Sequence, residues 1–309
     1  MRNFLFHRVH PKRDKLWDPM DPALFEKCIK YITKNYDVVS LEEYVLSEKK
    51  YNSHKKVATI LFDDGYKDNI EYAVPILQKY KCPASFYIVT ECIDKNIPTW
   101  THIVEYLFQN TKKSTINFDT SNFPLQLQKA HFSNEVEKLN YIKQLKPYLK
   151  SISHTNRLVI LNQVQDAIND VSLPQKMMSW SDIKELSQAG YKIGSHTVTH
   201  AMLGTINDEQ IVEEELLASA NAIEKQVGSF PKTISYPVGS YNSTTIKLSQ
   251  KVGYKIGLAV KQDTYKPERD NIYEIPRIEL YNEPWFKTRL RITNHLEEIK
   301  SLIGYKKHK

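Results

Sequence analysis

Residues 57–62 read Val-Ala-Thr-Ile-Leu-Phe, a run of strand length that is apolar apart from one threonine. A strand with one face in water alternates apolar and polar residues, whereas a strand covered on both faces does not. We therefore interpret residues 57–62 as a buried strand of a parallel sheet. The run ends abruptly in Asp63-Asp64-Gly65, which places two carboxylates at the end of the strand where parallel α/β folds hold their active sites.

The segments on both sides of this run alternate between strand and helix patterns. Asp21-Pro22 is typical of a helix start, and apolar residues follow it near helical spacing. We predict strands at 3–9, 38–39 and 84–89, a helix after Pro22, a polar helix from Leu41 and a helix at about 67–80. This alternation indicates a parallel α/β architecture.

The alternation lapses between about residues 97 and 178, a stretch that contains no glycine. Within it, Val136, Leu139, Ile142 and Leu145 share one face of a helix, and a second amphipathic pattern follows. We predict a mostly helical insertion at 97–178.

The alternation resumes after the insertion. We expect Asn207 to cap a long helix at about 208–227, and Gly228 to end it in a left-handed conformation. Further helices are predicted at 181–189 and 244–252, and further strands at 191–194, 233–236, 255–260 and 273–280. About seven parallel strands predict an α/β barrel of the (β/α)7 type, with residues 1–309 forming a single domain around the insertion.

The composition, with 41% hydrophobic and 26% charged residues, is that of a soluble globular protein. Its nine glycines form no glycine-rich linker, collagen repeat or dinucleotide-binding G-x-G-x-x-G. The three cysteines form no C-x-x-C, so neither a disulfide framework nor a zinc ribbon is indicated. The N-terminus reads as a strand rather than a signal peptide, and no segment has the ~18 apolar residues of a membrane span. We expect a cytoplasmic protein.

The net charge of +7 comes from 43 Lys and Arg against 36 Asp and Glu. The excess is spread along the chain apart from a terminal cluster at Lys306, Lys307 and Lys309. This pattern is typical of a solvated basic surface, and it leaves peripheral association with an anionic membrane or polymer open. No nucleic-acid-binding motif accompanies the charge, so we expect no nucleic-acid partner; nothing in the sequence indicates an oligomeric state.

Asp63 and Asp64 are adjacent carboxylates, which repel each other and are costly to bury unless a cation or hydrogen bonds offset the cost. A bound metal ion would do so, and Gly65 would permit a sharp turn that brings both side chains into one pocket. The alternative is that Asp-Asp-Gly is an ordinary polar turn.

His196 and His200 stand four residues apart just after the predicted strand at 191–194. If residues 196–200 form a helical turn, both imidazoles lie on one face within reach of one ion. Two imidazoles and one carboxylate leave coordination positions open for water and substrate, which is the pattern of a catalytic metal site. Such a donor set favours Zn²⁺ among divalent metals without requiring it.

The motifs FDDG at 62–65, GSHTVTH at 194–200 and SYPVGSYN at 235–242 together resemble those of the polysaccharide deacetylases, carbohydrate esterase family 4. LFHRVHP at 5–11, VVSLEEY at 38–44, the stretch at 177–196 and EIPRIEL at 274–280 resemble members of this family too. The resemblance covers about residues 4–280 apart from the insertion. It implies a distorted parallel β/α barrel and a metal-dependent hydrolase acting on carbon–nitrogen bonds of carbohydrates.

The resemblance also implies roles for individual residues. Asp63 matches the catalytic base, and the metal ligands match Asp64, His196 and His200. The oxyanion would rest on the metal and on the backbone N–H of Val238, which follows the Tyr236-Pro237 turn. Trp180 is expected to pack beneath the site or at its rim, and a role in the core is favoured over a direct role in the chemistry.

Two departures from the family pattern bear on the general acid and on the residue that orients Asp63. The setting of the late His295 does not resemble the family's usual acid motif, and His7 resembles a permuted subgroup whose acid is N-terminal. We expect His7 to be the acid; the alternative is a hydrogen-bonded core histidine. Many members carry an arginine where this chain has Ser235. We expect Arg277 to supply that charge, the alternative being a surface arginine paired with Glu274 or Glu279.

These features predict removal of an N-acetyl group from a polysaccharide or glycan precursor. A second hypothesis keeps the same residues but makes the substrate an aminosugar on a nucleotide or lipid carrier, deacetylated or deformylated during surface-polysaccharide synthesis. A third is a non-catalytic carbohydrate-binding protein on a decayed deacetylase fold.

Overall fold

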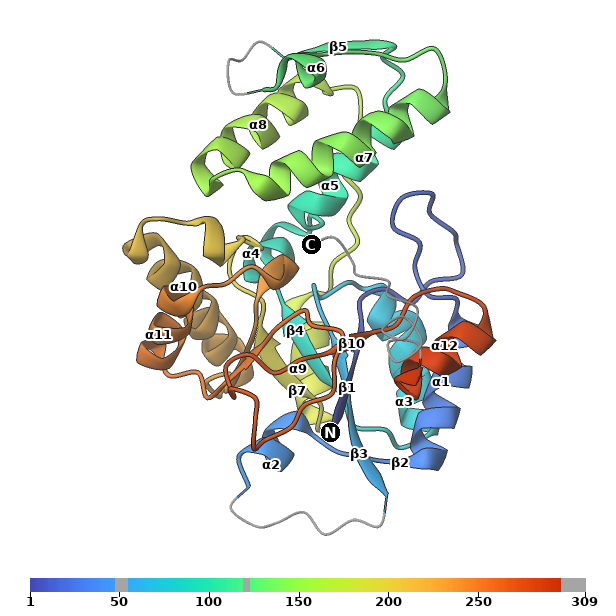
Figure 1. The fold of residues 1–309 in the computed structure, drawn as a ribbon, viewed down its shortest axis with the longest axis vertical. Helices are drawn as coiled ribbons and strands as arrows, with labels where there is room; N and C mark the ends of the chain where they lie inside the picture. Colours follow the sequence, from blue (N-terminus) through green and yellow to red (C-terminus); the bar gives the residue numbers. More distant parts are fainter. Residues whose placement is uncertain (48–54, 119–122, 296–309) are drawn as a thin grey trace.

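The computed structural model describes residues 1–47, 55–118 and 123–295. Its centre is a sheet of parallel strands in the order β10-β1-β3-β4-β7-β8-β9, with β2 paired to the start of β3. The strands are β1 (Arg2–Phe6), β2 (Tyr36–Val38), β3 (Lys56–Phe62), β4 (Ser85–Ile88), β7 (Lys192–Ser195), β8 (Thr233–Ser235), β9 (Ile256–Leu258) and β10 (Ile278–Glu279). The sheet is curled and helices surround it (Figure 1), so the predicted distorted parallel β/α barrel is confirmed.

The central strand β3 is buried from Ala58 to Phe62, as its apolar run predicts. Its register with both neighbours places Phe6, Phe62 and Phe86 side by side across three strands. The Phe62 ring stacks on the rings of Phe6 and Phe86, with centroids 5.4 Å and 4.9 Å away. This stack holds the three strands in register, so the residues that follow each of them emerge at the same end of the barrel.

Among the described residues outside the predicted insertion, helices pack around the sheet. They are α1 (Pro22–Asn35), α2 (Leu41–Val45), α3 (Val74–Lys79), α4 (Thr90–Lys95), α9 (Trp180–Gln188), α10 (Glu209–Val227), α11 (Ser243–Val252) and α12 (Trp285–Ile292), with a π-helical turn η1 (Asn69–Ala73) and the 3-10 turns η2 (Leu203–Thr205) and η3 (Pro237–Gly239). As predicted, Asp21 caps α1 through the amides of Ala23 and Leu24.

Three details differ from the sequence predictions. The helix predicted at 67–80 begins as the π-helical turn η1, because Pro75 at the start of α3 has no N–H to continue a regular helix. The cap of α10 is Asp208 rather than Asn207; the Asp208 side chain accepts from the amide of Gln210. The strand predicted at 273–280 is reduced to β10, preceded by a single bridge from Ile275 to Leu258 of β9.

The segment predicted as an insertion contains α5 (Trp100–Asn110), α6 (Leu125–Gln128), α7 (Glu135–Ser151), α8 (His154–Ala167) and an antiparallel pair, β5 (Thr115–Asn117) with β6 (Lys129–His131). These elements share their own apolar cluster and lie beyond the carboxyl ends of the barrel strands (Figure 1). Ile142 and Leu145 lie on the buried face of α7 as predicted, together with Tyr141 and Leu149, whereas Val136 was expected there and is 63% exposed.

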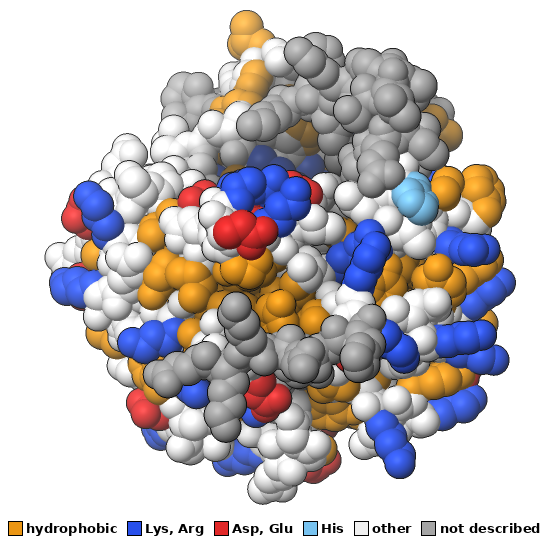
Figure 2. Space-filling model, turned by 60° about the horizontal axis from the view of Figure 1, so that its bottom comes forward, with side chains coloured by type: hydrophobic (Ala, Val, Ile, Leu, Met, Phe, Trp, Pro, Cys, Tyr) orange, Lys and Arg blue, Asp and Glu red, His pale blue; other side chains and the backbone are white. Residues whose placement is uncertain are grey.

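The surface of the described residues agrees with the spread of charge in the sequence. On the face in Figure 2, Lys and Arg side chains stand among uncharged ones and are most frequent toward the right-hand side. All three cysteines are buried and free. None of the described helices has both the length and the apolar character needed to cross a bilayer.

Candidate metal centre and catalytic pocket

The end of β3 turns sharply so that both carboxylates enter one pocket. Asp63 still follows the strand, since its amide donates to the carbonyl of Phe6, whereas Asp64 and Gly65 have φ of 77° and 84°. Positive φ is strained for a residue with a side chain, and a Cβ on Gly65 would also lie 3.2 Å from Ile88. Both carboxylates are almost completely buried. Because Asp63-Asp64-Gly65 is buried and has a strained backbone, it is not the ordinary polar turn that the sequence left open.

The two histidines come from a loop after β7, and the expected helical turn is wrong. Residues 196–200 contain no helix, and Thr197 and His200 have φ of 67° and 60°. The buried carboxylate of Glu215 on α10 holds this loop, because it accepts from the amides of Val198 (2.9 Å) and Thr199 (3.0 Å) and from the Thr199 hydroxyl (2.6 Å). Tertiary contacts thus bring both imidazoles to one side.

The loop places His196 Nε2 and His200 Nε2 each 3.4 Å from Asp64 Oδ1. The ligand atoms of these three buried residues lie within 4.8 Å of one another. Asp64 Oδ1 has no hydrogen-bond partner in the described structure, and an unpaired buried carboxylate oxygen is costly. His196 Nδ1 lies 2.7 Å from the carbonyl of Ser235, so it carries the proton and leaves Nε2 free as a ligand. The three residues fit a divalent metal ion.

Asp63 lies beside this cluster and is held by a different set of groups. Arg277 Nη1 lies 2.8 Å from both oxygens of Asp63, and the Ser235 hydroxyl donates to Asp63 Oδ2 at 3.0 Å. Arg277 is 1% exposed and its Nε donates to the carbonyl of Ala259. Burial alone would raise the pKa of Asp63, but the charge and hydrogen bonds of Arg277 outweigh burial and hold that pKa below its ordinary value. The surface pairing of Arg277 with Glu274 or Glu279 is excluded.

Asp63 and the three candidate metal ligands line one cavity of about 270 Å³ that His7, Val238 and Glu279 also line. His7 Nδ1 lies 3.5 Å from Glu279 Oε1, and the His7 ring packs edge-on against Trp17. His7 therefore faces the cavity and is not enclosed in the core. Val238, the central residue of η3, has a φ of 57° and lines the cavity.

Tyr236, Trp180 and His295, which the sequence analysis also considered, do not line the catalytic cavity. Tyr236 is buried and stacks on Tyr241 in a separate apolar cluster, which also contains Leu203 and Tyr254. The Trp180 indole donates to Asp94 and packs against the main core. His295 is exposed and contacts Thr293 just after α12.

Two positioning residues were missed by the sequence reasoning. Ser235 was noted as a departure from the family pattern but not as a hydrogen-bond donor to Asp63, although its place two residues before Pro237 marks it as part of the site. Glu215 is the last of three consecutive glutamates, Glu213 to Glu215, in a long helix, and no local pattern distinguishes it from the other two.

Glu215→Ala is expected to lower the free energy of unfolding by about 3 kcal/mol, because three loop donors lose their buried acceptor. Retention of added Zn²⁺ should weaken by about 10- to 100-fold, as for loss of a group that orients metal ligands. Urea unfolding of the metal-free protein and a competition titration with a zinc chelator measure the two effects. Glu214→Ala, the exposed neighbour, is the control; equal effects in both variants would contradict the role of Glu215.

Comparisons with known proteins agree with this arrangement. A family model described as "Polysaccharide deacetylase" matches residues 50–257, which include Asp63, Asp64, His196 and His200. YxkH of Bacillus subtilis, whose name describes it as a polysaccharide deacetylase, is 24% identical over 77% of this chain. The match spans 57% of the length of YxkH. The poly-β-1,6-N-acetyl-D-glucosamine N-deacetylase of Staphylococcus aureus is 23% identical over 90% of this chain and 73% of that protein.

Among solved structures, the Streptococcus pyogenes deacetylase PplD, in complex with acetate, superimposes with a TM-score of 0.61 at 18% identity over 92% of this chain and 93% of PplD. At this identity the likeness extends to the fold alone. The family match over residues 50–257, two thirds of the chain, shows more: the chain belongs to the polysaccharide deacetylases, carbohydrate esterase family 4.

Proposed function

We propose that the protein is a metal-dependent hydrolase that removes N-acetyl groups from a carbohydrate. The observation that carries the proposal is the buried Asp63, held by Arg277, beside the cluster of Asp64, His196 and His200 in one cavity. The name of the S. aureus relative, an N-deacetylase of poly-β-1,6-N-acetyl-D-glucosamine, supports an N-acetylglucosamine polymer as the substrate.

Asp64, His196 and His200 would hold the metal, and two imidazoles with one carboxylate favour zinc. Bound there, a divalent metal lowers the pKa of a coordinated water and polarises the carbonyl of the acetamide.

Asp63 is the base in this proposal. It accepts a proton from the attacking water, and the Arg277 and Ser235 contacts keep its carboxylate ionised and correctly oriented. The backbone N–H of Val238 donates to the oxygen that gains charge as the water adds. His7, which lines the same cavity, protonates the departing amine, and Glu279 orients the His7 ring.

Removal of the metal tests this proposal. Dialysis against a chelator is expected to lower acetate release from β-1,6-linked N-acetylglucosamine oligomers by more than about a hundredfold, since polarisation of the carbonyl and activation of water are lost together. One equivalent of Zn²⁺ should restore the rate. Dialysis against the calcium-saturated chelator is the control. Full activity in protein shown by elemental analysis to be free of metal would refute the proposal.

A further inference from the structure

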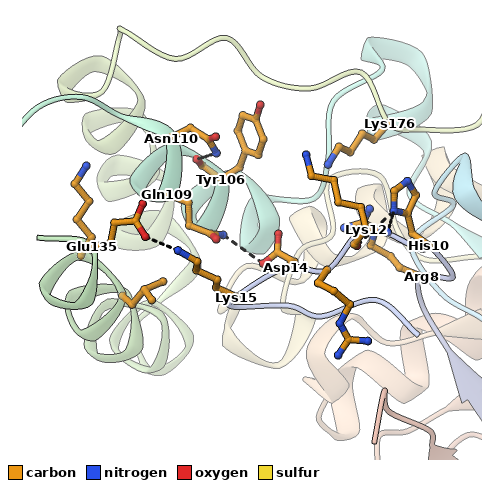
Figure 3. Close-up of a pocket in the computed structure, with 13 residues that line it drawn as sticks. Arg8, His10, Lys12, Asp14, Lys15, Tyr106, Gln109, Asn110, Glu135 and Lys176 are labelled. Carbon is orange, nitrogen blue, oxygen red and sulfur yellow. Dashed lines mark hydrogen bonds and ion pairs between the residues drawn. The ribbon is translucent and has the colours of Figure 1, made fainter. Parts of the chain in front are cut away.

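A second cavity, of about 260 Å³, lies next to the catalytic one and is rich in cationic side chains. It is formed by the loop that follows β1 and by α5 and α7 of the 97–178 segment (Figure 3). Arg8, His10, Lys12 and Lys176 gather on one side of it, while Lys15 lies on the opposite side near Glu135 (Figure 3). Six Lys and Arg side chains line this cavity against two acidic ones.

Part of this charge is not neutralised by the protein. Arg8 is buried and bonded to Asp68, and its guanidinium lies over the rings of Trp17 and Tyr66. Lys12 and Lys176 make no ion pair within the part of the chain that the structure describes. Burial, together with the charges of Arg8 and Lys12, lowers the pKa of Lys176. Like charges held together in this way favour an anion between them.

The wall opposite these cations carries neutral hydrogen-bonding groups. Tyr106, Gln109 and Asn110 of α5 line the cavity, and the Lys176 ammonium lies 5.6 Å from the centre of the Tyr106 ring. Amides, a phenol ring and an anion-binding group together are the means by which proteins bind charged sugars, since the ring covers a sugar face and the amides reach its hydroxyls.

A groove that shares lining residues with both cavities lies between the cationic cavity and the catalytic one. Lys15 lines both the cationic cavity and this groove, which runs along α7. That groove shares Glu105, Lys146 and Lys150 with the catalytic cavity. The direct wall between the two cavities is thin, because His7 packs on Trp17 on the catalytic side and Arg8 lies over Trp17 on the other. One chain can therefore extend from the catalytic cavity along α7 to Lys12 and Lys176.

We propose that this groove binds an acidic glycan, with phosphate groups on the units beside the acetylated sugar contacting Lys12 and Lys176. The inference rests on the proposed deacetylase function and specifies its substrate class. Phosphate on such a substrate has two sources, phosphodiesters within a polymer or the diphosphate of a carrier. A carrier diphosphate is attached to the reacting sugar itself and would lie near Lys146 and Lys150, so the extended groove favours the polymer.

The test compares three substrates in the metal-loaded protein: a polymer of N-acetylglucosamine 1-phosphate units, a neutral β-1,6-linked N-acetylglucosamine oligomer and UDP-N-acetylglucosamine. The double variant Lys12→Gln/Lys176→Gln is expected to raise KM for the phosphate polymer about tenfold at low salt with kcat unchanged, and to change KM for the other two less than about twofold. High salt should remove most of the difference. Lys247→Gln, an exposed change on α11, is the matched control.

Calorimetric binding of the phosphate polymer to Asp63→Asn protein separates this inference from the proposed function, because it needs no turnover. Tenfold weaker binding after Lys12→Gln/Lys176→Gln supports the inference even if no substrate releases acetate. Equal binding with and without the two lysines overturns it, even if the neutral oligomer is deacetylated. A lysine-dependent effect on UDP-N-acetylglucosamine, or on vesicles of anionic phospholipid but not on the polymer, also overturns it.

Discussion

Asp63→Asn is expected to lower the rate of acetate release by about a thousandfold while the bound metal is retained. Asparagine has nearly the same shape as aspartate but cannot accept the proton of the attacking water, and a positioned base contributes about 10²- to 10⁴-fold. The metal should stay because Asp64, His196 and His200 remain. Acetate release by the purified variant, with elemental analysis of the same sample, measures both quantities.

Two further variants, at a metal ligand and at a hydrogen-bond donor to Asp63, should give a larger and a smaller loss of activity than Asp63→Asn. Asp64→Asn should lose metal and activity together, because Asp64 Oδ1 is the carboxylate oxygen that both imidazoles face. Ser235→Ala removes one hydrogen bond to Asp63 and should retain most of the activity, since Arg277 still holds both oxygens. An Asp63→Asn protein with full activity would show that another group takes the proton.

Arg277→Met is expected to lower the free energy of unfolding by about 3 to 5 kcal/mol, because it leaves the buried Asp63 carboxylate without its cation. The effect should be measured by urea unfolding of metal-free protein, so that metal binding does not contribute. Arg289→Met, on the exposed surface of α12, should change stability by about 0.5 kcal/mol or less.

A double variant tests whether this loss comes from the charge on Asp63. Arg277→Met/Asp63→Asn removes both charges and should recover a large part of the stability lost in Arg277→Met alone. If the losses from the two single changes simply add, Arg277 stabilises the barrel through packing and its bond to Ala259, and Asp63 does not depend on it.

Local sequence patterns predicted most of the barrel because each depends on near neighbours. The apolar run of β3, the Asp21 cap of α1 and the left-handed Gly228 follow from the side chains at those positions. Predictions failed where a distant segment decides the outcome. The face of α7 that is buried depends on what packs against it, which left Val136 exposed. The π-helical turn before α3 is a different case, because Pro75 is a local signal that the prediction of a regular helix at 67–80 overlooked.

The sequence by itself determined the family, the parallel architecture and the two carboxylates at the end of β3, because motif residues and hydrophobic runs are local properties. Only the tertiary structure decided how the site is assembled. Residues 196–200 form a loop held by Glu215, and Arg277, more than 200 positions from Asp63, is buried against it. The physical reason is that buried charges and loop amides must find partners, and the fold, not spacing along the chain, brings those partners within reach.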